Sequence, residues 1–346
     1  MRVETTTFVK LSGNNWVNCT MVKAKVWKIQ KFFSGAPKED DLVFTEEDLP
    51  DIKDGEMLIE ALYLSVDPYM RLFIRDKGTV GQTMFGEQVA RVIESKNKEY
   101  PVGTLVRTFA GWRSHTIISS TSRQMPNVAD LSPSTALGVL GMPGMTAYFG
   151  FLDICKPQEG ETVFVNCAAG AVGSTVVQIA KIMKCRVIGF AGNEEKCQWL
   201  RDLGADYAYN YKNVSLADAI KEAAPNGVDC YFDNVGGDFT STVLQHMKVY
   251  GRISVSGQIS TYNSGDPQTG VLPYPSILVK QLSVQGFMVD TKYGDRFQEG
   301  ESQMLKWIEE GKLKVRETMT YGIENMYAAF CGLFTGQNVG KAVVKC

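Results

Sequence analysis

Residues 165–174, VNCAAGAVGS, have the composition of a turn that could hold the phosphates of a dinucleotide. From residue 168 the small residues follow the spacing A-x-G-x-x-G, which lets a backbone turn tightly and approach a pyrophosphate. The spacing alone is weak evidence, because small-residue turns also have purely structural uses. Here it follows an apolar segment and opens an amphipathic one. We therefore predict that the amides of a helix start hold a pyrophosphate at Gly170, Ala171, Val172 and Gly173.

The next predicted strand distinguishes between the two nicotinamide cofactors. Proteins that bind NAD place an acidic residue about 20 residues after the glycines, where it accepts hydrogen bonds from the adenosine ribose. Residues 189–193 occupy that zone with the sequence GFAGN and contain no acid. Lys196 follows within one helical turn, where its ammonium could reach a 2′-phosphate, although surface lysines are also common. The missing acid and the lysine together favour NADP (NADPH) as the cofactor.

Metal and hydrolase chemistry have little support in the sequence. The chain has two histidines, His115 and His246, and neither has the spacing of a metal ligand. Its eight cysteines include no Cys-x-x-Cys, and no Gly-x-Ser-x-Gly motif is present. We therefore predict no metal site, no disulfide framework and a reaction driven by the cofactor. Scattered cysteines of this kind are typical of a reduced, cytoplasmic protein.

The length, charge and hydropathy of the chain argue against a nucleic-acid-binding, membrane-bound or secreted protein. With 346 residues, 44% of them hydrophobic, the chain can form two domains with sizeable cores. Its formal net charge of −2 gives no electrostatic reason to expect nucleic acid or an anionic membrane as a partner. No apolar run reaches the roughly 20 residues of a membrane span. Residues 1–20 lack the apolar stretch of a secretory signal, and regular patterning begins at Met21. A small-molecule substrate is therefore expected.

The hydrophobic pattern of the chain changes between its first and second halves. Residues 57–66, 88–95 and 104–112 read as strands between turns, and no strong helical period precedes about residue 134. This half is predicted to be an all-β, barrel-like unit. From residue 161 apolar strands alternate with amphipathic helices, one of them predicted over residues 239–249 with His246 on it. This alternation predicts a parallel, doubly wound sheet. The last segment ends in an apolar strand that could rejoin the first unit.

Seven motifs occur in one order along the chain: VDPYMR (66–71), GMPGMTAYFG (141–150), AAGAVGS (168–174), YNYK (209–212), YFDNVGG (231–237), GRISVSGQISTYN (251–263) and NVGK (338–341). Together they resemble the zinc-independent branch of the medium-chain dehydrogenases/reductases, from residue 21 to the C-terminus. The resemblance implies an α/β fold with a GroES-like β-barrel domain and a Rossmann doubly wound parallel sheet. It implies a substrate domain of residues 21–140 and 311–346 and an NADP-binding domain of residues 141–310. Residues 1–20 are left as an N-terminal extension of unknown order.

The resemblance also implies an activity. Members of this branch use NADPH to reduce the carbon–carbon double bond of α,β-unsaturated ketones and aldehydes. The implied substrates are 15-oxo-prostaglandins and lipid-derived alkenals, and some members also oxidise the 12-hydroxyl of a leukotriene. A homodimer is implied as well. Two alternatives stay open: a quinone reductase of the same superfamily, and a non-catalytic dinucleotide-binding protein.

Roles for individual residues follow from the resemblance by matching positions. Lys196, with Tyr211 beside it, would bind the 2′-phosphate, and Asn234 would border the ribose and the nicotinamide. Two loops would cover the nicotinamide, one made of Ser256, Gly257, Gln258, Ile259, Ser260, Thr261 and Tyr262, the other running from Phe287, Met288 and Val289 to Tyr293. Asn338 would close the cofactor site. Tyr69 would line the substrate cleft from the β domain, as a second member of the catalytic site.

Tyr262 is the residue that we expect to take part in the chemistry. A neutral phenol can donate to the carbonyl oxygen on which negative charge develops, directly or through the ribose hydroxyl. Without the resemblance, Tyr262 would be an ordinary turn residue. The sequence offers no convincing protein acid for the α-carbon, so water is the expected proton source. Cys167, where the family has alanine, is expected to be harmless, and residues 260–276 leave the substrate preference open.

Overall fold

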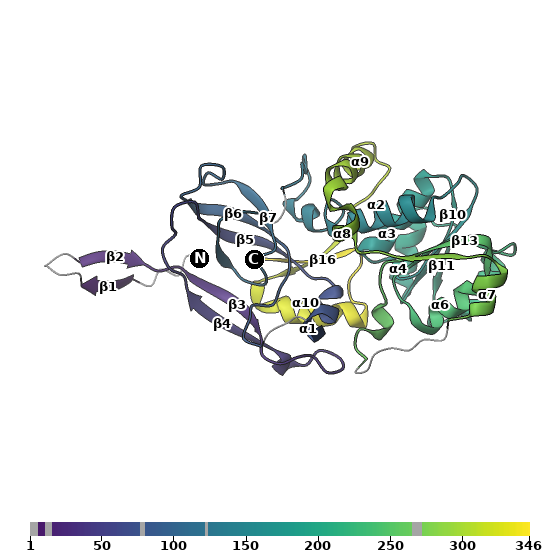
Figure 1. Cartoon of the computed structure of the whole chain (residues 1–346), viewed down its shortest axis with the longest axis horizontal. Helices are drawn as coiled ribbons and strands as arrows, with labels where there is room; N and C mark the ends of the chain where they lie inside the picture. The colour runs from purple at the N-terminus through teal and green to yellow at the C-terminus, as the bar shows by residue number, and fades with distance from the viewer. Residues whose placement is uncertain (1–5, 11–15, 77–79, 122–123, 265–271) are drawn as a thin grey trace.

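The computed structural model describes residues 6–10, 16–76, 80–121, 124–264 and 272–346. Two six-stranded sheets dominate it, one toward each end of the long axis (Figure 1). The sheet at the right of the figure is parallel, and the sheet at the left is mostly antiparallel. Residues 265–271, within the loop on which the substrate preference was predicted to depend, lie outside the described ranges.

The parallel sheet has the strand order β11-β10-β9-β12-β13-β14, and every neighbouring pair is parallel. Its strands are β9 (Thr162–Val165), β10 (Arg186–Ala191), β11 (Tyr207–Asn210), β12 (Val228–Asp233), β13 (Met247–Val255) and β14 (Ser283–Gly286). The order reverses between β9 and β12. In open α/β sheets ligands bind at such a switch point, outside the carboxyl ends of the strands.

Helices cover both faces of this sheet (Figure 1). Val163 and Val165 of β9 face one core, and Phe164 between them faces the other, as the two-residue period of a strand requires. The first core includes buried side chains from α2 (Met142–Phe149), α3 (Ala171–Ile182), α4 (Glu194–Asp202) and α9 (Phe297–Glu309). The second includes side chains from α5 (Leu216–Ala223) and α6 (Gly237–Leu244). The predicted doubly wound sheet is confirmed.

The other large sheet has the order β15-β16-β5-β6-β7, and β8 also pairs with β5. Its strands are β5 (Met57–Ser65), β6 (Gln88–Ser95), β7 (Leu105–Thr108), β8 (His115–Ile118), β15 (Glu317–Tyr321) and β16 (Lys341–Lys345). A separate antiparallel pair, β3 (Lys23–Ile29) with β4 (Leu42–Asp48), lies beside it. Val343 of β16 pairs with Ser65 of β5, so the end of the chain completes a sheet that its first half begins.

A helix lies in the half of the chain that the sequence pattern predicted to be all-β. It is α1 (Tyr69–Asp76), and Met70 and Ile74, four residues apart, are fully buried along it. The prediction was wrong because a helix of eight residues gives only two turns, too few for a clear helical period.

The predicted helix over residues 239–249 also needs correction. The helix, α6, ends at Leu244, and β13 begins at Met247, so His246 lies in the connection between them. Its amide donates to the carbonyl of Val243 at 2.8 Å, which closes the last turn. Apolar residues continue from the helix into the strand, so the sequence pattern did not indicate where the helix ends.

Residues 1–20, which look irregular in sequence, contain two strands. They are β1 (Thr6–Lys10) and β2 (Trp16–Thr20), which pair antiparallel with each other and form a sheet of their own. This hairpin projects from the body of the protein at the left of Figure 1. Within the ranges that the structure describes, no helix is both long and apolar enough to span a membrane.

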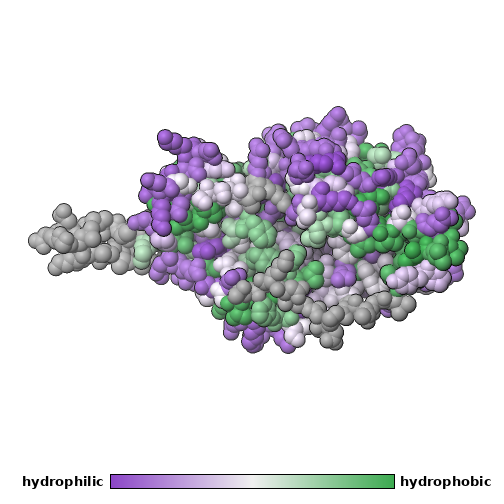
Figure 2. Space-filling view, in the orientation of Figure 1, coloured by the Kyte–Doolittle hydropathy of each residue, from purple (hydrophilic) through white to green (hydrophobic). Residues whose placement is uncertain are grey.

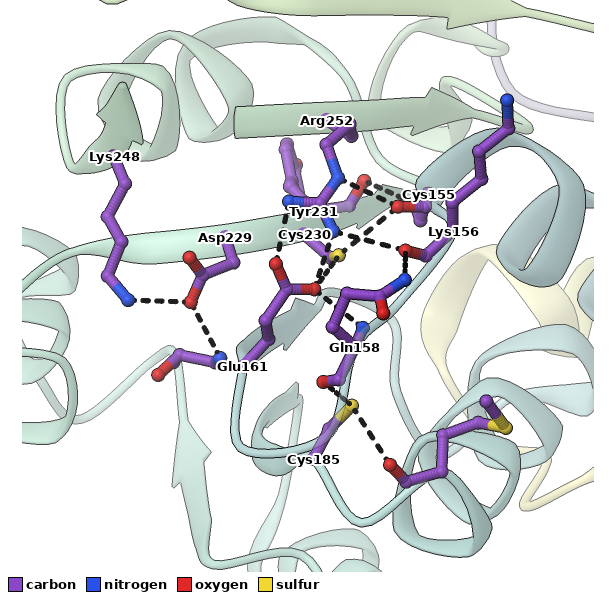
Figure 3. Close-up of polar contacts among 12 residues, drawn as sticks. Cys155, Lys156, Gln158, Glu161, Cys185, Asp229, Cys230, Tyr231, Lys248 and Arg252 are labelled. Carbon is purple, nitrogen blue, oxygen red and sulfur yellow. Dashed lines mark hydrogen bonds and ion pairs between the residues drawn. The ribbon is translucent and has the colours of Figure 1, made fainter. Parts of the chain in front are cut away.

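Polar contacts near the amino ends of β9 and β12 fix these strands to β13 (Figure 3). Arg252 of β13 donates to the Glu161 carboxylate at 2.9 Å and to the carbonyl of Cys155 at 2.8 Å. The Asp229 carboxylate accepts from Lys248 at 2.7 Å and from the amide of Thr162 at 2.8 Å. The opposite, carboxyl edge of the same strands carries the candidate site.

Candidate active site

The glycine turn leads directly into α3. Gly170 is the N-cap residue, and its amide donates to the carbonyl of Cys167 at 3.1 Å. A β-carbon on Gly173 would lie 2.4 Å from the Cys167 oxygen and 2.7 Å from Cα of Ala168, so only glycine fits. Within the described ranges no side chain caps α3, so the amides of Ala171, Val172 and Gly173 at the helix start can face an anion.

The tail of the chain reaches this turn. The amide of Gly340 donates to the carbonyl of Ala169 at 2.8 Å, and Gly340 forms a parallel bridge with Gly170. Asn338, two residues earlier, donates from its side-chain amide to the Gly340 carbonyl at 2.9 Å. The structure therefore brings Asn338 beside the predicted pyrophosphate turn.

Lys196 lies at the carboxyl end of β10, in the first turn of α4. Asn193 caps this helix, and its side-chain oxygen accepts from the amide of Lys196 at 2.9 Å. The Lys196 side chain is half-buried; burial lowers its pKa, and the nearby charge of Lys212 lowers it further. Among the residues that the structure describes, no carboxylate forms an ion pair with it. Glu195, the neighbouring carboxylate, is paired with Arg316 at 2.7 Å, so the two lysines make a site suited to an anion.

Tyr211 shares this corner with Lys196. Its ring lies 3.3 Å from the point where a β-carbon on Gly192 would lie, and its amide donates to the carbonyl of Ala191 at 3.1 Å. Half of the Tyr211 side chain is exposed (51%). The ends of β10 and β11 thus place Tyr211 and Lys196 together, as predicted from the family resemblance.

Asn234 is held by a second asparagine that sequence reasoning missed. Its amide donates to the side-chain oxygen of Asn166 at 2.7 Å, and its side-chain amide donates to the Asn166 carbonyl at 2.9 Å. The hydroxyl of Ser256 donates to the Asn234 side-chain oxygen at 2.7 Å. Asn166, Asn234 and Ser256 follow β9, β12 and β13, which are neighbours in the sheet, so three strand ends meet here.

A buried carboxylate fixes the backbone of the same turn. Asp233 is 1% exposed and accepts hydrogen bonds from the amides of Val235 and Gly236, both at 3.0 Å. It also accepts from the hydroxyls of Tyr231 at 2.8 Å and Thr240 at 2.6 Å. Sequence reasoning missed this role as well; the only signal was the position of the aspartate within the YFDNVGG motif.

The loop of residues 256–262 lies against the Asn234 turn. The amides of Ser256 and Gly257 donate to the carbonyl of Asp233 at 2.9 and 3.3 Å. Ile259 and Ser260 donate to the carbonyls of Asn234 and Val235, at 3.1 and 3.2 Å. The short helix η4 (Ile259–Thr261) follows. The hydroxyl of Thr261 donates a hydrogen bond to the carbonyl of Gln258 at 3.0 Å and stabilises this helix.

Tyr262 ends this loop and folds back over it. Its hydroxyl oxygen accepts from the amide of Gln258 at 3.4 Å, which leaves the hydroxyl hydrogen available to another acceptor. Burial raises the pKa of the phenol, so the group stays neutral at physiological pH and can donate. The geometry is that of a hydrogen-bond donor at the carboxyl edge of the sheet.

Phe287, Met288 and Val289 follow β14 and pack in a different place. The Phe287 ring lies 2.4 Å from the point where a β-carbon on Gly150 would lie, just beyond α2, and 6.3 Å from the ring of Tyr293. Val289, the first residue of α8 (Val289–Tyr293), is buried, and Met288 is exposed. Phe287 and Val289 pack in the core on the α2 side of the parallel sheet, and none of the described contacts joins them to Asn234 or Tyr262.

Tyr69 is the first residue of α1, in the other half of the molecule. Its ring packs against Phe73 at 5.8 Å and against Phe85 at 6.4 Å between ring centroids. Asp67, two residues earlier, forms a buried ion pair with Lys341 at 2.8 Å, and Lys341 follows Gly340, which bridges to Gly170 of the glycine turn. The start of α1 therefore lies near the candidate cofactor site.

Two family models match the chain. The N-terminal domain of oxidoreductase matches residues 25–125, and the zinc-binding dehydrogenase model matches residues 171–310. The second name implies a metal, but in the described ranges no three His, Cys, Asp or Glu side chains are grouped to hold one. The described residues therefore do not fit the zinc site that this name implies.

Known proteins similar to the chain include enzymes and a cofactor complex. Prostaglandin reductase 1 of Bos taurus is 50% identical over 332 residues, 94% of this chain and 100% of the relative. The NADPH-dependent curcumin reductase of Escherichia coli is 38% identical over 330 residues, 92% of this chain and 96% of the relative. Among solved structures, CurA of Vibrio vulnificus in complex with NADPH superposes with a TM-score of 0.88 at 38% identity, covering 93% of this chain and 98% of that one.

Proposed function

Because the chain belongs to the prostaglandin reductase group of the medium-chain dehydrogenase/reductase family, we propose that it is an NADPH-dependent reductase of α,β-unsaturated ketones and aldehydes. It reduces the carbon–carbon double bond conjugated to the carbonyl. The observation that carries this proposal is the neutral, half-buried phenol of Tyr262, which lies on a loop bound to the Asn234 turn with its hydrogen free to donate.

NADPH fits the donor set of the site. The uncapped start of α3 suits the pyrophosphate, because its free amides and the helix dipole both favour negative charge. Lys196, with Lys212 and Tyr211 near it, suits a 2′-phosphate and would bind it. Asn234 and Ser256 would border the ribose and nicotinamide, with Asn338 closing the site from the tail.

The protein contributes orientation and electrostatic support to the reaction. When bound, NADPH supplies the hydride for the β-carbon of the substrate. Tyr262 donates a hydrogen bond to the carbonyl oxygen, where negative charge then develops, and a positioned donor of this kind contributes about 3–4 kcal/mol. The Asn166–Asn234 pair and Asp233 hold the loop that carries Tyr262. Water delivers the proton to the α-carbon.

A substrate panel tests the proposal. Purified full-length protein is assayed with an enone, an enal and an ortho-quinone, each with NADPH and with NADH, and the products are identified by mass. We expect the enone and the enal to gain two hydrogens with NADPH and to react much more slowly with NADH. Turnover of the quinone alone would replace this function with quinone reduction, and no turnover of any substrate would leave only a dinucleotide-binding protein.

The physiological substrates that we propose are lipids. The 15-oxo-prostaglandins and lipid-peroxidation alkenals carry the conjugated carbonyl that Tyr262 would polarise, together with long apolar chains. Oxidation of a leukotriene 12-hydroxyl would use the same site with the hydride moving in the opposite direction. The name of the Bos taurus relative, prostaglandin reductase 1, supports the 15-oxo-prostaglandins as substrates. A role in prostaglandin, fatty acid and wider lipid metabolism would follow.

We also propose that two copies of the chain associate through β14. All four residues of this edge strand are exposed, and α7 (Tyr274–Val279) beside it exposes Tyr274, Leu278 and Val279 by more than 70%. Figure 2 shows hydrophobic residues gathered at the end of the molecule where Figure 1 places α7. Unpaired backbone groups at an exposed edge can pair with the same edge of a second copy, which also covers the apolar side chains.

Two further expectations from the sequence belong to this proposal. The described cysteines, seven in number, are all free, which supports a reducing compartment such as the cytoplasm. The proposed division of the chain assigns residues 141–310 to NADP and residues 21–140 with 311–346 to the substrate. Separate expression of residues 141–310 and measurement of its NADPH affinity would test this division.

A further inference from the structure

Glu317, the first residue of β15, has one carboxylate oxygen that accepts a hydrogen bond and one that does not. The hydroxyl of Ser134, in the short helix η2 (Pro133–Leu137), donates to its Oε2 at 2.7 Å. Oε1 is buried, and no donor in the described part of the chain lies within hydrogen-bonding distance of it. It lies 3.9 Å from the point where a β-carbon on Gly138 would lie, against the backbone that follows η2. A negative charge on this carboxyl is therefore only partly compensated.

The cationic side chains around Glu317 are bound to other groups. Lys341 pairs with Glu317 in the parallel register of β15 and β16, but its ammonium donates to Asp67 at 2.8 Å. Two further cations line the same cavity as Glu317, and both have other partners: Arg316 donates to Glu195 at 2.7 Å, and Lys314 donates to the carbonyl of Asp202 at 3.1 Å.

This cavity also reaches the helix start proposed for the pyrophosphate. Glu317 lines it from one side, and Ala171, Ser174 and Thr175 of α3 line it from the other. Its volume of about 20 Å³ has room for roughly one water molecule, much less than a carboxylate needs for full hydration. Ala171 carries one of the amides assigned to the pyrophosphate, so the bound phosphates and the Glu317 carboxyl lie close together with little water between them.

We infer that Glu317 takes up a proton when the nicotinamide cofactor binds. This inference rests on the proposed function, in which the start of α3 binds the pyrophosphate, and it adds a proton to that binding step. A negative charge nearby disfavours the ionised form of a carboxyl, and so does burial. In the protein without cofactor, burial already raises the pKa of Glu317 by more than the Ser134 hydroxyl and the Lys341 ammonium lower it.

The sign of the pH dependence follows from this argument. The phosphates raise the pKa of Glu317 further, so the bound protein keeps the proton up to a higher pH than the unbound protein does. Between these two pH values, binding takes up a proton and the affinity for the cofactor falls as the pH rises. Below this window Glu317 is neutral in both states, and above it Glu317 is ionised in both, so the affinity no longer depends on this group.

The test measures the dissociation constant of NADP⁺, which withstands acidic buffers, from about pH 5 to about pH 9. Wild type is compared with Glu317→Gln, which keeps the shape of the side chain and an acceptor for Ser134 but stays neutral. The 2′-phosphate titrates in both proteins, so the ratio of their dissociation constants isolates Glu317. We expect the ratio of wild type to variant to be close to one in acid. It should rise to about three- to tenfold at alkaline pH, as expected for two like charges several ångströms apart in a partly hydrated site.

Two further measurements test the same group. Calorimetric titration in buffers of different ionisation enthalpy counts the protons, and wild type should take up more than Glu317→Gln within the pH window. Ser134→Ala removes a donor that stabilises the ionised carboxyl, so it should move the fall in affinity to higher pH. Glu324→Gln is the matched control, because Glu324 is exposed and lies shortly after β15. It should follow the wild-type curve.

The outcomes separate this inference from the proposed function. A ratio of wild type to Glu317→Gln that stays constant over the pH range overturns the inference and leaves the cofactor site intact. Equal proton uptake by these two proteins, or a curve for Ser134→Ala that coincides with that of wild type, does the same. Failure of wild type to bind NADP⁺ at any pH overturns the proposed cofactor site, and the inference with it.

Discussion

At the scale of single residues, two side chains carry most of the proposed chemistry. Tyr262 has its oxygen occupied by an amide and its hydrogen free, which suits a donor better than a base. Lys196 has its charge partly desolvated and, in the described part of the chain, without a carboxylate partner. Each arrangement leaves a polar group that a ligand can use, which is typical of functional residues.

Removing the Tyr262 hydroxyl should affect the chemical step more than binding. We expect Tyr262→Phe to lower kcat for enones by about 100-fold, as loss of a donor to an oxyanion does, with little change in the KM for NADPH. Tyr250→Phe, at an exposed position, serves as the control. Unchanged turnover in Tyr262→Phe would remove this residue from the chemistry while leaving the cofactor site untouched.

The pH dependence of the reaction should report on the same phenol. The neutral form is the donor, and burial raises the pKa of Tyr262 above the usual value near 10. Activity that depends on this group should therefore persist as the pH rises to about 10 and fall only above it. A pH–rate profile of kcat checks this, and an alkaline limb with its midpoint below 10 that disappears in Tyr262→Phe would contradict it.

Lys196 should determine the choice between the two nicotinamide cofactors. Loss of a hydrogen bond to a charged group costs about 1.5–3 kcal/mol, so Lys196→Ala should weaken NADPH binding by about 10- to 100-fold. NADH, which lacks the 2′-phosphate, should bind almost as before. Titration of both cofactors measures this, with the exposed Lys184→Ala as control. Equal losses for NADPH and NADH would reject the assignment.

At the scale of elements, β16 and α1 are joined by a buried ion pair. Lys341 of β16 and Asp67 before α1 are 4% and 7% exposed in their side chains, and the Ser65 hydroxyl also donates to Asp67. The pair orients the start of α1, which carries Tyr69. Breaking a buried pair by removing one partner leaves the other charge uncompensated.

Lys341→Met should therefore be strongly destabilising. We expect a loss of about 3–5 kcal/mol in the free energy of unfolding, measured by urea denaturation of the full chain. Lys345→Met, at an exposed position of the same strand, should change it by less than about 0.5 kcal/mol. The double variant Lys341→Met with Asp67→Leu should recover part of the loss, and a loss as large as in the single variant would show that the charges are not coupled.

The elements that the sequence predicted best are those with long, regular patterns. The segment that became α3 has apolar residues at helical spacing over three turns, and β6 was predicted with its observed ends. The short helix α1 and the junction of α6 with β13 could not be predicted, because neither interrupts the apolar pattern for long enough.

Within the candidate site, the predicted residues that the structure brings close together belong to local motifs, and their roles remain predictions. The glycine turn, Lys196 and Tyr211 come together because each follows a strand of one parallel sheet. Asn166 was missed because its contacts with Asp233 and Asn234 join positions 67 and 68 residues apart, which no local pattern encodes. The assignments of Tyr69 to the substrate cleft and of residues 287–289 to a loop over the nicotinamide remain predictions.

At the scale of the whole molecule, the antiparallel half is linked to the parallel half, and the edge strand β14 of the parallel sheet is exposed. Arg107 of β7 donates to Glu301 of α9 at 2.8 Å and to the carbonyl of Leu140 at 3.1 Å, which fixes the antiparallel half against the parallel half. The open edge is β14, the last strand of the parallel sheet.

A charge on the β14 edge should separate the proposed dimer. Val284 is 45% exposed on this strand, and Val284→Lys would place two like charges at the two-fold axis. We expect the wild-type protein to sediment as a dimer of 38.3 kDa chains and the variant as a monomer. Val102→Lys, at an exposed position of the other half, should remain dimeric. A wild-type monomer in analytical ultracentrifugation would refute this assembly.

The pairing of β16 with β5 also sets an order for biosynthesis. Synthesis produces β5 before the strands of the parallel sheet and β16 after them, so the antiparallel sheet can be completed only once residues 341–345 have been made. The parallel half of the nascent chain can thus assemble first, and the antiparallel half follows when β16 reaches β5.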